Sequence, residues 1–249
     1  MPPATLHTSR VPVTLAALTV LLQIAYPLVQ GRLRDGLTVA TVVAFFAASL
    51  SHAVLTRGPA WAARLAAITA GLGLLAEAAG VTTGFPFGDY HYTGSLGAEV
   101  LGVPVLVPLA WTMFAYPCLL VGRRLADGWR AAAVGGLALA SWDLFLDPQM
   151  VAAGHWQWQH AQPGLNGIPL TNTLGWIAVG MLMMAALALL PTDVPPQEAD
   201  DRVPATLFLW TYASSVVANA VFFARPGVAL AGGIGMGLVA LPFARSLVR

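Results

Sequence analysis

One apolar run of the chain ends in Ser141-Trp142-Asp143-Leu144-Phe145-Leu146-Asp147-Pro148. Its two carboxylates, Asp143 and Asp147, are four residues apart. This spacing is about one helical turn, so both side chains point the same way if the run is helical. A charged side chain inside a membrane-spanning helix costs at least ~2.5 kcal/mol and usually faces protein or a water-filled cavity. The pair is therefore a candidate functional site within a membrane helix.

The composition of the whole chain is that of an integral membrane protein. Only 9% of its 249 residues are charged and 57% are hydrophobic, whereas roughly 25% of the residues in soluble domains are charged. The chain contains arginine but no lysine, which excludes chemistry that needs a lysine amine, such as a Schiff base. The formal net charge of +1 gives no support to nucleic-acid binding. A single cysteine, Cys118, excludes an internal disulfide and a multi-cysteine metal site.

Eight runs are long and apolar enough to cross a bilayer, which takes about 20 residues per helix. They cover residues 11–30, 37–55, 62–82, 101–121, 131–147, 169–190, 204–223 and 228–244. The sequence therefore predicts an all-α, polytopic membrane helical bundle of about eight transmembrane helices. We expect one integral membrane domain over residues 1–249, without a clear internal repeat. The helix at 131–147 is predicted to end before Pro148, because proline interrupts helices.

The arginines predict how the bundle is oriented in the membrane. With a cytoplasmic N-terminus, nine of the 12 arginines flank the cytoplasmic ends of the spans and three flank the outer ends. Basic residues concentrate on the cytoplasmic side of membrane proteins. We therefore expect a multi-pass protein of the cytoplasmic membrane with both termini inside. The two long connections, residues 83–100 and 148–168, then lie outside.

This topology brings several polar residues to one membrane depth. Glu77 lies near the outer end of the third predicted helix, and Asp89 follows in the loop. Asp143 and Asp147 end the fifth helix, and Asn172 is one turn into the sixth. Carboxyls held close together in a low dielectric do not both ionise easily, so one keeps its proton and can act as a general acid. The four acidic residues are our candidate catalytic residues.

Both outer connections are rich in aromatic residues, in Gly84–Thr93 and again in Gly154–Trp158. They form either the aromatic mouth of a pocket or an interfacial belt of the kind that membrane proteins commonly have. The candidate substrate-binding residues are Trp142, Tyr90, Tyr92, Trp111, Trp156, Trp158, Asn172 and His155. The five histidines are too scattered for the closely spaced boxes of membrane di-iron enzymes. We expect no metal and no cofactor.

Three further motifs can be compared with known families, namely Gly84–Thr93, Gly102–Trp111 and Trp142–Met150. Together they resemble the carotenoid hydratase family, which includes the bisanhydrobacterioruberin hydratases of haloarchaea and related bacterial enzymes. The resemblance is clearest over residues 80–176. It implies that water is added to the terminal C=C bond of an acyclic carotenoid end, giving a tertiary alcohol without a redox cofactor.

The candidate residues suit that reaction. A carboxylic acid protonates the double bond, aromatic faces stabilise the tertiary carbocation, and water captures it. We assign the proton donor to Asp143, and the positioning of water or tuning of the donor to Asp147 or Glu77. The expected partners are a carotenoid dissolved in the bilayer and water.

Two other functions also fit the sequence. Asp143-x-x-x-Asp147 also resembles the acidic motifs of intramembrane prenyltransferases, which hold Mg²⁺ against a diphosphate. Such sites usually add Lys or Arg clamps, and the two long connections contain no arginine. A non-enzymatic transporter or pigment scaffold is the second alternative, since intramembrane acids also serve proton relays.

Overall fold

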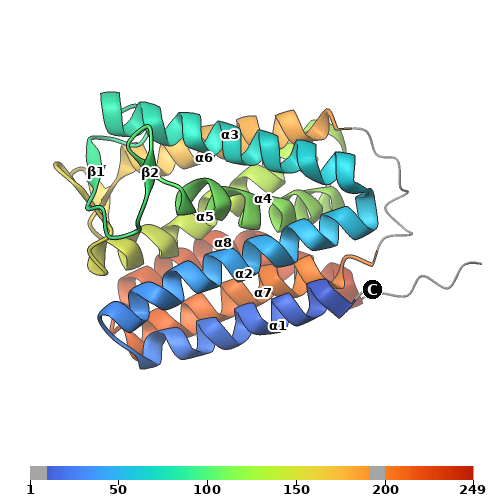
Figure 1. Ribbon diagram of the computed structural model, residues 1–249, viewed down its shortest axis with the longest axis horizontal. Coiled ribbons are helices and arrows are strands. Elements are labelled where there is room, and N and C mark those ends of the chain that lie inside the picture. The colour runs from blue at the N-terminus through green and yellow to red at the C-terminus, as the bar shows by residue number, and fades with distance from the viewer. Residues whose placement is uncertain (1–9, 191–199, 249) are drawn as a thin grey trace, which may run out of the picture.

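The computed structural model describes residues 10–190 and 200–248, and its long helices run side by side in one bundle (Figure 1). Within these residues there are eight such helices. They are α1 (Arg10–Ala25), α2 (Arg32–Arg57), α3 (Pro59–Thr83), α4 (Leu106–Leu125), α5 (Gly128–Ala152), α6 (Leu170–Ala188), α7 (Arg202–Val217) and α8 (Pro226–Val248). Two short helices extend α1 and α7, namely η1 (Tyr26–Leu28) and the π-helical η2 (Ala218–Phe222).

Length and composition make seven of the described helices candidates for crossing a membrane. The eighth, α5, carries Asp143 and Asp147, has 25 residues and packs against α4, α6 and α8 inside the bundle. The prediction of an all-α polytopic membrane bundle is therefore confirmed. Arg10 and Val248 lie at the same end of the bundle (Figure 1). Which side of the membrane this end faces stays a prediction.

Two predicted helix boundaries were wrong. The fourth helix begins at Leu106 instead of residue 101, because the chain first forms a short hairpin. The fifth continues through Pro148 to Ala152. A proline removes one backbone hydrogen bond, and membrane helices tolerate this loss where neighbouring helices surround them. The guanidinium of Arg225 donates to the carbonyl of Pro148 at 3.3 Å, which ties this turn of α5 to the residue before α8.

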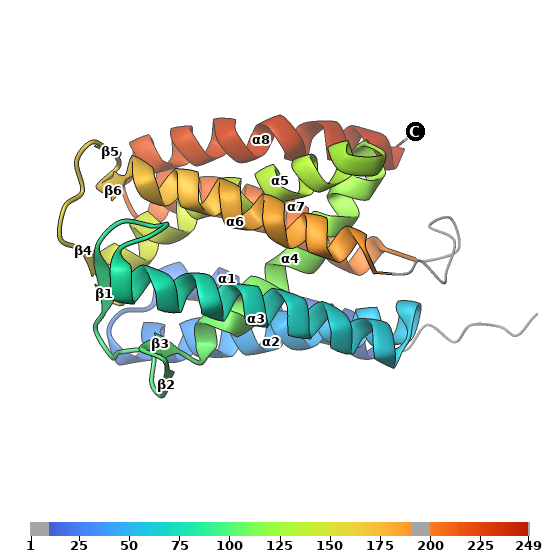
Figure 2. The ribbon, with the colours of Figure 1, turned by 90° about the horizontal axis from the view of Figure 1, so that it is seen from above.

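Short strands gather at the other end of the bundle (Figure 2). They form three two-stranded antiparallel sheets within or beside the connections predicted as loops. The pairs are β1 (Tyr90–Tyr92) with β4 (Trp156–Trp158), β2 (Glu99–Val100) with β3 (Val103–Pro104), and β5 (Gly164–Leu165) with β6 (Ile168–Pro169). Because β1 and β4 come from different connections, their pairing joins the ends of α3 and α5.

The two connections contain the same type of hairpin. Leu101 and Gly102 join β2 to β3 with φ angles of 54° and 75°, and Asn166 and Gly167 join β5 to β6 with 54° and 84°. Two successive residues with positive φ are the signature of the tight turn that fits twisted antiparallel strands. In both cases a helix follows closely after the hairpin. Leu101 and Asn166 therefore occupy equivalent positions in the two connections.

The similarity of the two hairpins extends to the helices that follow them, α4 and α6. Trp111 of α4 and Trp176 of α6 are separated along the chain by the same interval as Leu101 and Asn166. Their rings stack with centroids 4.1 Å apart and planes 16° apart. The β1–β4 pairing is centred on His91 and Gln157. The chain therefore does contain an internal repeat, contrary to the prediction. We call residues 59–125 the first repeat and residues 128–188 the second.

Candidate active site

A cavity of about 180 Å³ lies in the strand-bearing end of the bundle. The acidic residues and most of the aromatic residues of its wall come from the two repeats. On the other side, α1, α2 and α7 extend the wall, with Tyr26 and Phe223 as further aromatic residues. Its aromatic lining includes Phe87, Tyr90, Tyr92, Trp111, Trp142, Phe145, Trp156, Trp158 and Trp176. A single water occupies roughly 10–15 Å³ of such a volume. The cavity therefore has room for the end group of an apolar molecule together with water.

Glu77 of α3 is one of two carboxyls that line this cavity. It is 6% exposed and accepts three hydrogen bonds. Tyr90 donates to Oε2, Tyr92 donates to the same oxygen at 2.8 Å, and the indole of Trp111 donates to Oε1 at 3.0 Å. Burial, and then the proximity of Glu77, raises the pKa of both tyrosine hydroxyls. The tyrosines thus remain donors, and the three donors match the acceptor-only, ionised form of a carboxyl.

The second carboxyl of the cavity, Asp147, belongs to a pair. The side-chain nitrogen of Asn172 donates to Asp147 at 2.5 Å and to Asp143 at 2.8 Å. All three side chains are buried, at 3%, 1% and 1% exposure for Asp147, Asp143 and Asn172. One amide from α6 therefore holds both acids of α5 in place. The prediction that the two acids share one face of a helix is confirmed.

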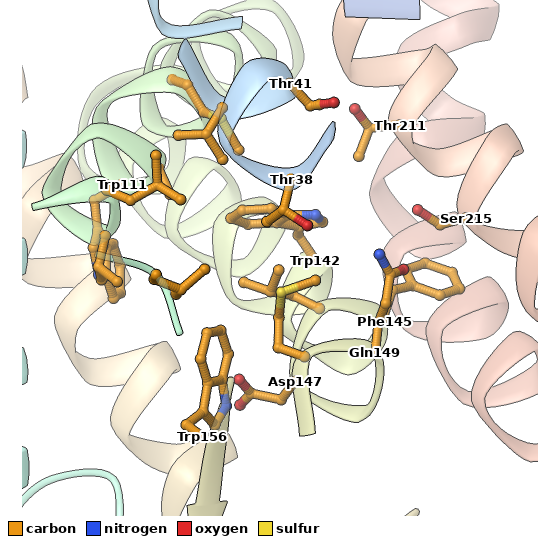
Figure 3. Close-up of a pocket in the computed structure, with 18 of the residues that line it drawn as sticks. Thr38, Thr41, Trp111, Trp142, Phe145, Asp147, Gln149, Trp156, Thr211 and Ser215 are labelled. Carbon is orange, nitrogen blue, oxygen red and sulfur yellow. The ribbon is translucent and has the colours of Figure 1, made fainter. Parts of the chain in front are cut away.

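The two acids of the pair differ in access to the cavity. Asp147 lines it, beside the indole of Trp156 (Figure 3). Asp143 is not part of the lining, and its Oδ1 has no hydrogen-bond partner in the described part of the chain. A buried polar atom without a partner is rare in proteins, and bound water, an ion or a catalytic role commonly accounts for one. Asp143 thus lies behind Asp147, connected to it through Asn172.

The structure brings most of the predicted site residues together. Glu77, Asp147, Asn172 and the six predicted tyrosines and tryptophans all line the cavity. Asp89 does not, because it is exposed on the loop before β1. His155 is buried outside the cavity, where a ring nitrogen pairs with the hydroxyl of Ser95 at 2.8 Å. Burial lowers the pKa of His155.

Sequence reasoning missed other lining residues. Trp176 was identifiable only through its position in the repeat, opposite Trp111. Hydroxyl and amide side chains of α1, α2 and α7 were missed because scattered Ser, Thr and Gln residues are ordinary in apolar helices.

The fold and the cavity define a membrane-embedded, all-α protein with buried carboxyls in an aromatic chamber. Residues 36–242 match the family described as "Carotenoid biosynthesis protein". The chain belongs to this family.

The chain is also 34% identical over 110 residues to the bisanhydrobacterioruberin hydratase of Haloarcula japonica. The matched segment covers 42% of this chain and 37% of that relative. These matches confirm the resemblance to carotenoid hydratases. No solved structure matches the chain.

Proposed function

We propose that this protein is a carotenoid hydratase that adds water to the terminal C=C bond of an acyclic carotenoid end. The observation that carries the proposal is the unequal hydrogen bonding of buried carboxyls around one aromatic cavity. Glu77 accepts from three donors, whereas Asp143 and Asp147 lie against each other and share the amide of Asn172, with the indole of Trp156 beside Asp147. Paired carboxyls in unlike surroundings are how enzymes separate an acid from a stabilising anion.

In this proposal the Asp143–Asp147 pair supplies the proton. Asp147 lines the cavity and Asp143 does not, so Asp147 is the group that touches the alkene. Asp143 then serves as the proton reserve behind it. This reverses the roles expected from the sequence, where the deeper position of Asp143 favoured it as the donor.

Protonation converts the π bond into a C–H bond and a tertiary carbocation, and leaves Asp147 as a carboxylate. The faces of Trp142, Trp156 and Trp176 stabilise the cation, and a desolvated cation–π contact contributes up to ~2 kcal/mol. The negative charge of Glu77, held by fixed donors, acts on the same cation without reorganising.

Capture by water completes the reaction. The water oxygen bonds to the cation, and the resulting oxonium passes one proton through further water in the cavity to Asp147. The net change is the addition of one water, with no change of oxidation state. A cavity of about 180 Å³ accommodates an end group, so the rest of the polyene stays in the bilayer and enters sideways between helices.

The cavity favours this reaction over diphosphate chemistry. Among the described residues that line it there is no arginine. The ion pairs of the described residues involve Asp201, Asp35 and Asp200 instead of the cavity carboxyls. A diphosphate would meet negative charge without the cationic clamps that such substrates need.

The test is expression in a host that makes lycopene, followed by mass measurement of the extracted pigment. We expect a gain of the mass of one water for each hydrated end, in the absence of added metal or nucleotide. Asp147→Asn is the inactive control. An unchanged pigment mass with well-expressed protein would contradict hydration of this substrate.

A further inference from the structure

The cavity has a second arm whose lining is polar but uncharged. Figure 3 shows Thr38 and Thr41 of α2 facing Thr211 and Ser215 of α7, across the cavity from Trp156. The arm also includes Gln23, Tyr26, Gln149 and Ser214. Most of these side chains come from α1, α2 and α7, which lie outside the two repeats.

Three oxygens of this arm are buried without a hydrogen-bond partner in the described part of the chain. They are Oε1 of Gln23, the hydroxyl of Tyr26 and Oγ1 of Thr41. Native proteins rarely leave such atoms unpaired, and ordered water usually satisfies them. Three of them on residues that line one cavity favour a small hydrogen-bonding molecule as its occupant.

Other hydroxyls of the arm are available only as acceptors. Thr38 donates to the carbonyl of Arg34 at 3.1 Å, and Thr211 donates to the carbonyl of Leu207 at 2.8 Å. Ser214 donates to the carbonyl of Thr211 at 3.4 Å. With their hydrogens directed at their own helices, these oxygens present lone pairs to a ligand. A water bound in this way gives its hydrogens to the wall and keeps its own lone pair free to attack.

The charge of the lining favours a neutral ligand. Among the described lining residues, only Glu77 and Asp147 carry a carboxyl, and both lie on the side of the cavity built by the repeats. A cation close to the arm is the guanidinium of Arg34, which lies 5.5 Å from the ring of Tyr26 and is not part of the lining. An organic cation has no acid within the arm. The arm suits a neutral donor such as water.

We propose that this polar arm binds and orients the water that captures the carbocation. The arm thereby sets the fraction of cations that become alcohol instead of losing a proton to return an alkene. This inference rests on the proposed hydratase function. It assigns Thr41, Ser215 and Gln23 to the binding of water, separately from the carboxyls that handle the proton.

The test measures this partition in D₂O with an acyclic carotene as substrate. Protonation places deuterium on carbon, and each cation then either gains water or loses H⁺ and returns as deuterated alkene. The ratio of alcohol to deuterated alkene reports water capture, and the sum of the two products reports protonation.

We expect Thr41→Val, Ser215→Ala and Gln23→Leu each to lower the ratio about threefold, the typical effect of one hydrogen bond. The sum of the products should change by less than about twofold. Matched controls are Thr19→Val and Ser51→Ala, whose hydroxyls bond within their own helices and do not line the cavity. These controls should keep the native ratio.

An unchanged ratio in all three variants would overturn the inference. The same result is expected if the arm binds a hydroxyl at the far end of an oxygenated substrate instead of water. A hydrocarbon carotene has no such hydroxyl, so the substitutions would then leave its product ratio unchanged. Thr41→Ser keeps the oxygen, so a low ratio in this variant would also overturn it. If the native protein gives neither alcohol nor deuterium exchange, the proposed hydratase function itself fails, which is a separate outcome.

Discussion

The two repeats place an acid at the same point and surround it differently. Asp143 follows Glu77 along the chain by the same interval at which β4 follows β1. In the first repeat, two tyrosines and a tryptophan donate to Glu77. In the second, Asn172 is the shared donor to Asp143 and Asp147. The same scaffold thus surrounds a carboxyl with three donors in one repeat and with a shared amide in the other. In the proposed reaction, this difference lets one side stabilise charge while the other supplies a proton.

The largest test of this comparison removes the acid of the second repeat that lines the cavity. Asp147→Asn should lower hydration by roughly 100- to 10,000-fold, the usual contribution of a general acid. Pigment mass and product yield measure the loss. Asp89→Asn changes an exposed carboxyl and should leave the yield unchanged. Equal losses in both variants would contradict the assignment of the acid to the cavity.

The next test neutralises the acid of the first repeat. Glu77→Gln keeps the shape of the side chain but removes the negative charge, and we expect about a 100-fold loss, comparable to losing one electrostatic contact to a transition state. The initial rate of alcohol formation in isolated membranes measures it. Activity equal to that of the native protein would show that Glu77 has only a structural role.

A third variant makes the second repeat resemble the first. Val107 occupies the position in the first repeat that Asn172 has in the second, by the same interval that relates Trp111 to Trp176. Asn172→Val should lower hydration about tenfold and the free energy of unfolding by ~1–3 kcal/mol, because two buried carboxyls lose their donor. Thermal unfolding in detergent and product yield measure the two effects. The neighbouring change Thr173→Val, outside the cavity lining, should do neither.

A smaller effect is expected when one of the three donors to Glu77 is removed. In Tyr92→Phe the carboxylate keeps its bonds from Tyr90 and Trp111. We expect about a threefold loss of activity, equivalent to one hydrogen bond. A loss as large as that of Glu77→Gln would mean that the three donors act as a unit.

The smallest expected effect concerns the residue just before each paired strand, Asp89 in the first repeat and His155 in the second. Burial lowers the pKa of His155 from its usual 6.5, so protonation favours the unfolded chain. The contribution of neutral His155 to the free energy of unfolding is complete above about pH 6.5. It is lost as the pH falls toward the lower pKa that His155 has in the folded state. His155→Gln should reduce the drop in melting temperature between pH 8 and pH 5. A drop that is the same in His155→Gln as in the native protein would contradict the role of the histidine.

Much of the fold and of the site was predictable because membrane helices and intramembrane acids have strong sequence signals. The eight apolar runs correspond to the eight helices, and the spacing of Asp143 and Asp147 predicts one shared face. The aromatic connections also marked the cavity wall. These signals depend only on local composition and spacing.

The remaining features depend on tertiary packing. The sequence does not show that α5 continues through Pro148, because surrounding helices compensate for the lost hydrogen bond. It also does not show that Asp147 instead of Asp143 reaches the cavity, since one turn of helix separates them on the same face. The repeat is hidden because its helices share few residues beyond hairpin and tryptophan positions.

The stacked pair Trp111 and Trp176 joins the two repeats at the wall of the cavity. A molecule that enters the cavity beside this pair would change the surroundings of both indole rings, and indole fluorescence responds to its surroundings. The intrinsic fluorescence of the protein would then change as the cavity fills. The same contact that holds the repeats together thus gives the protein a natural optical reporter of its own occupancy.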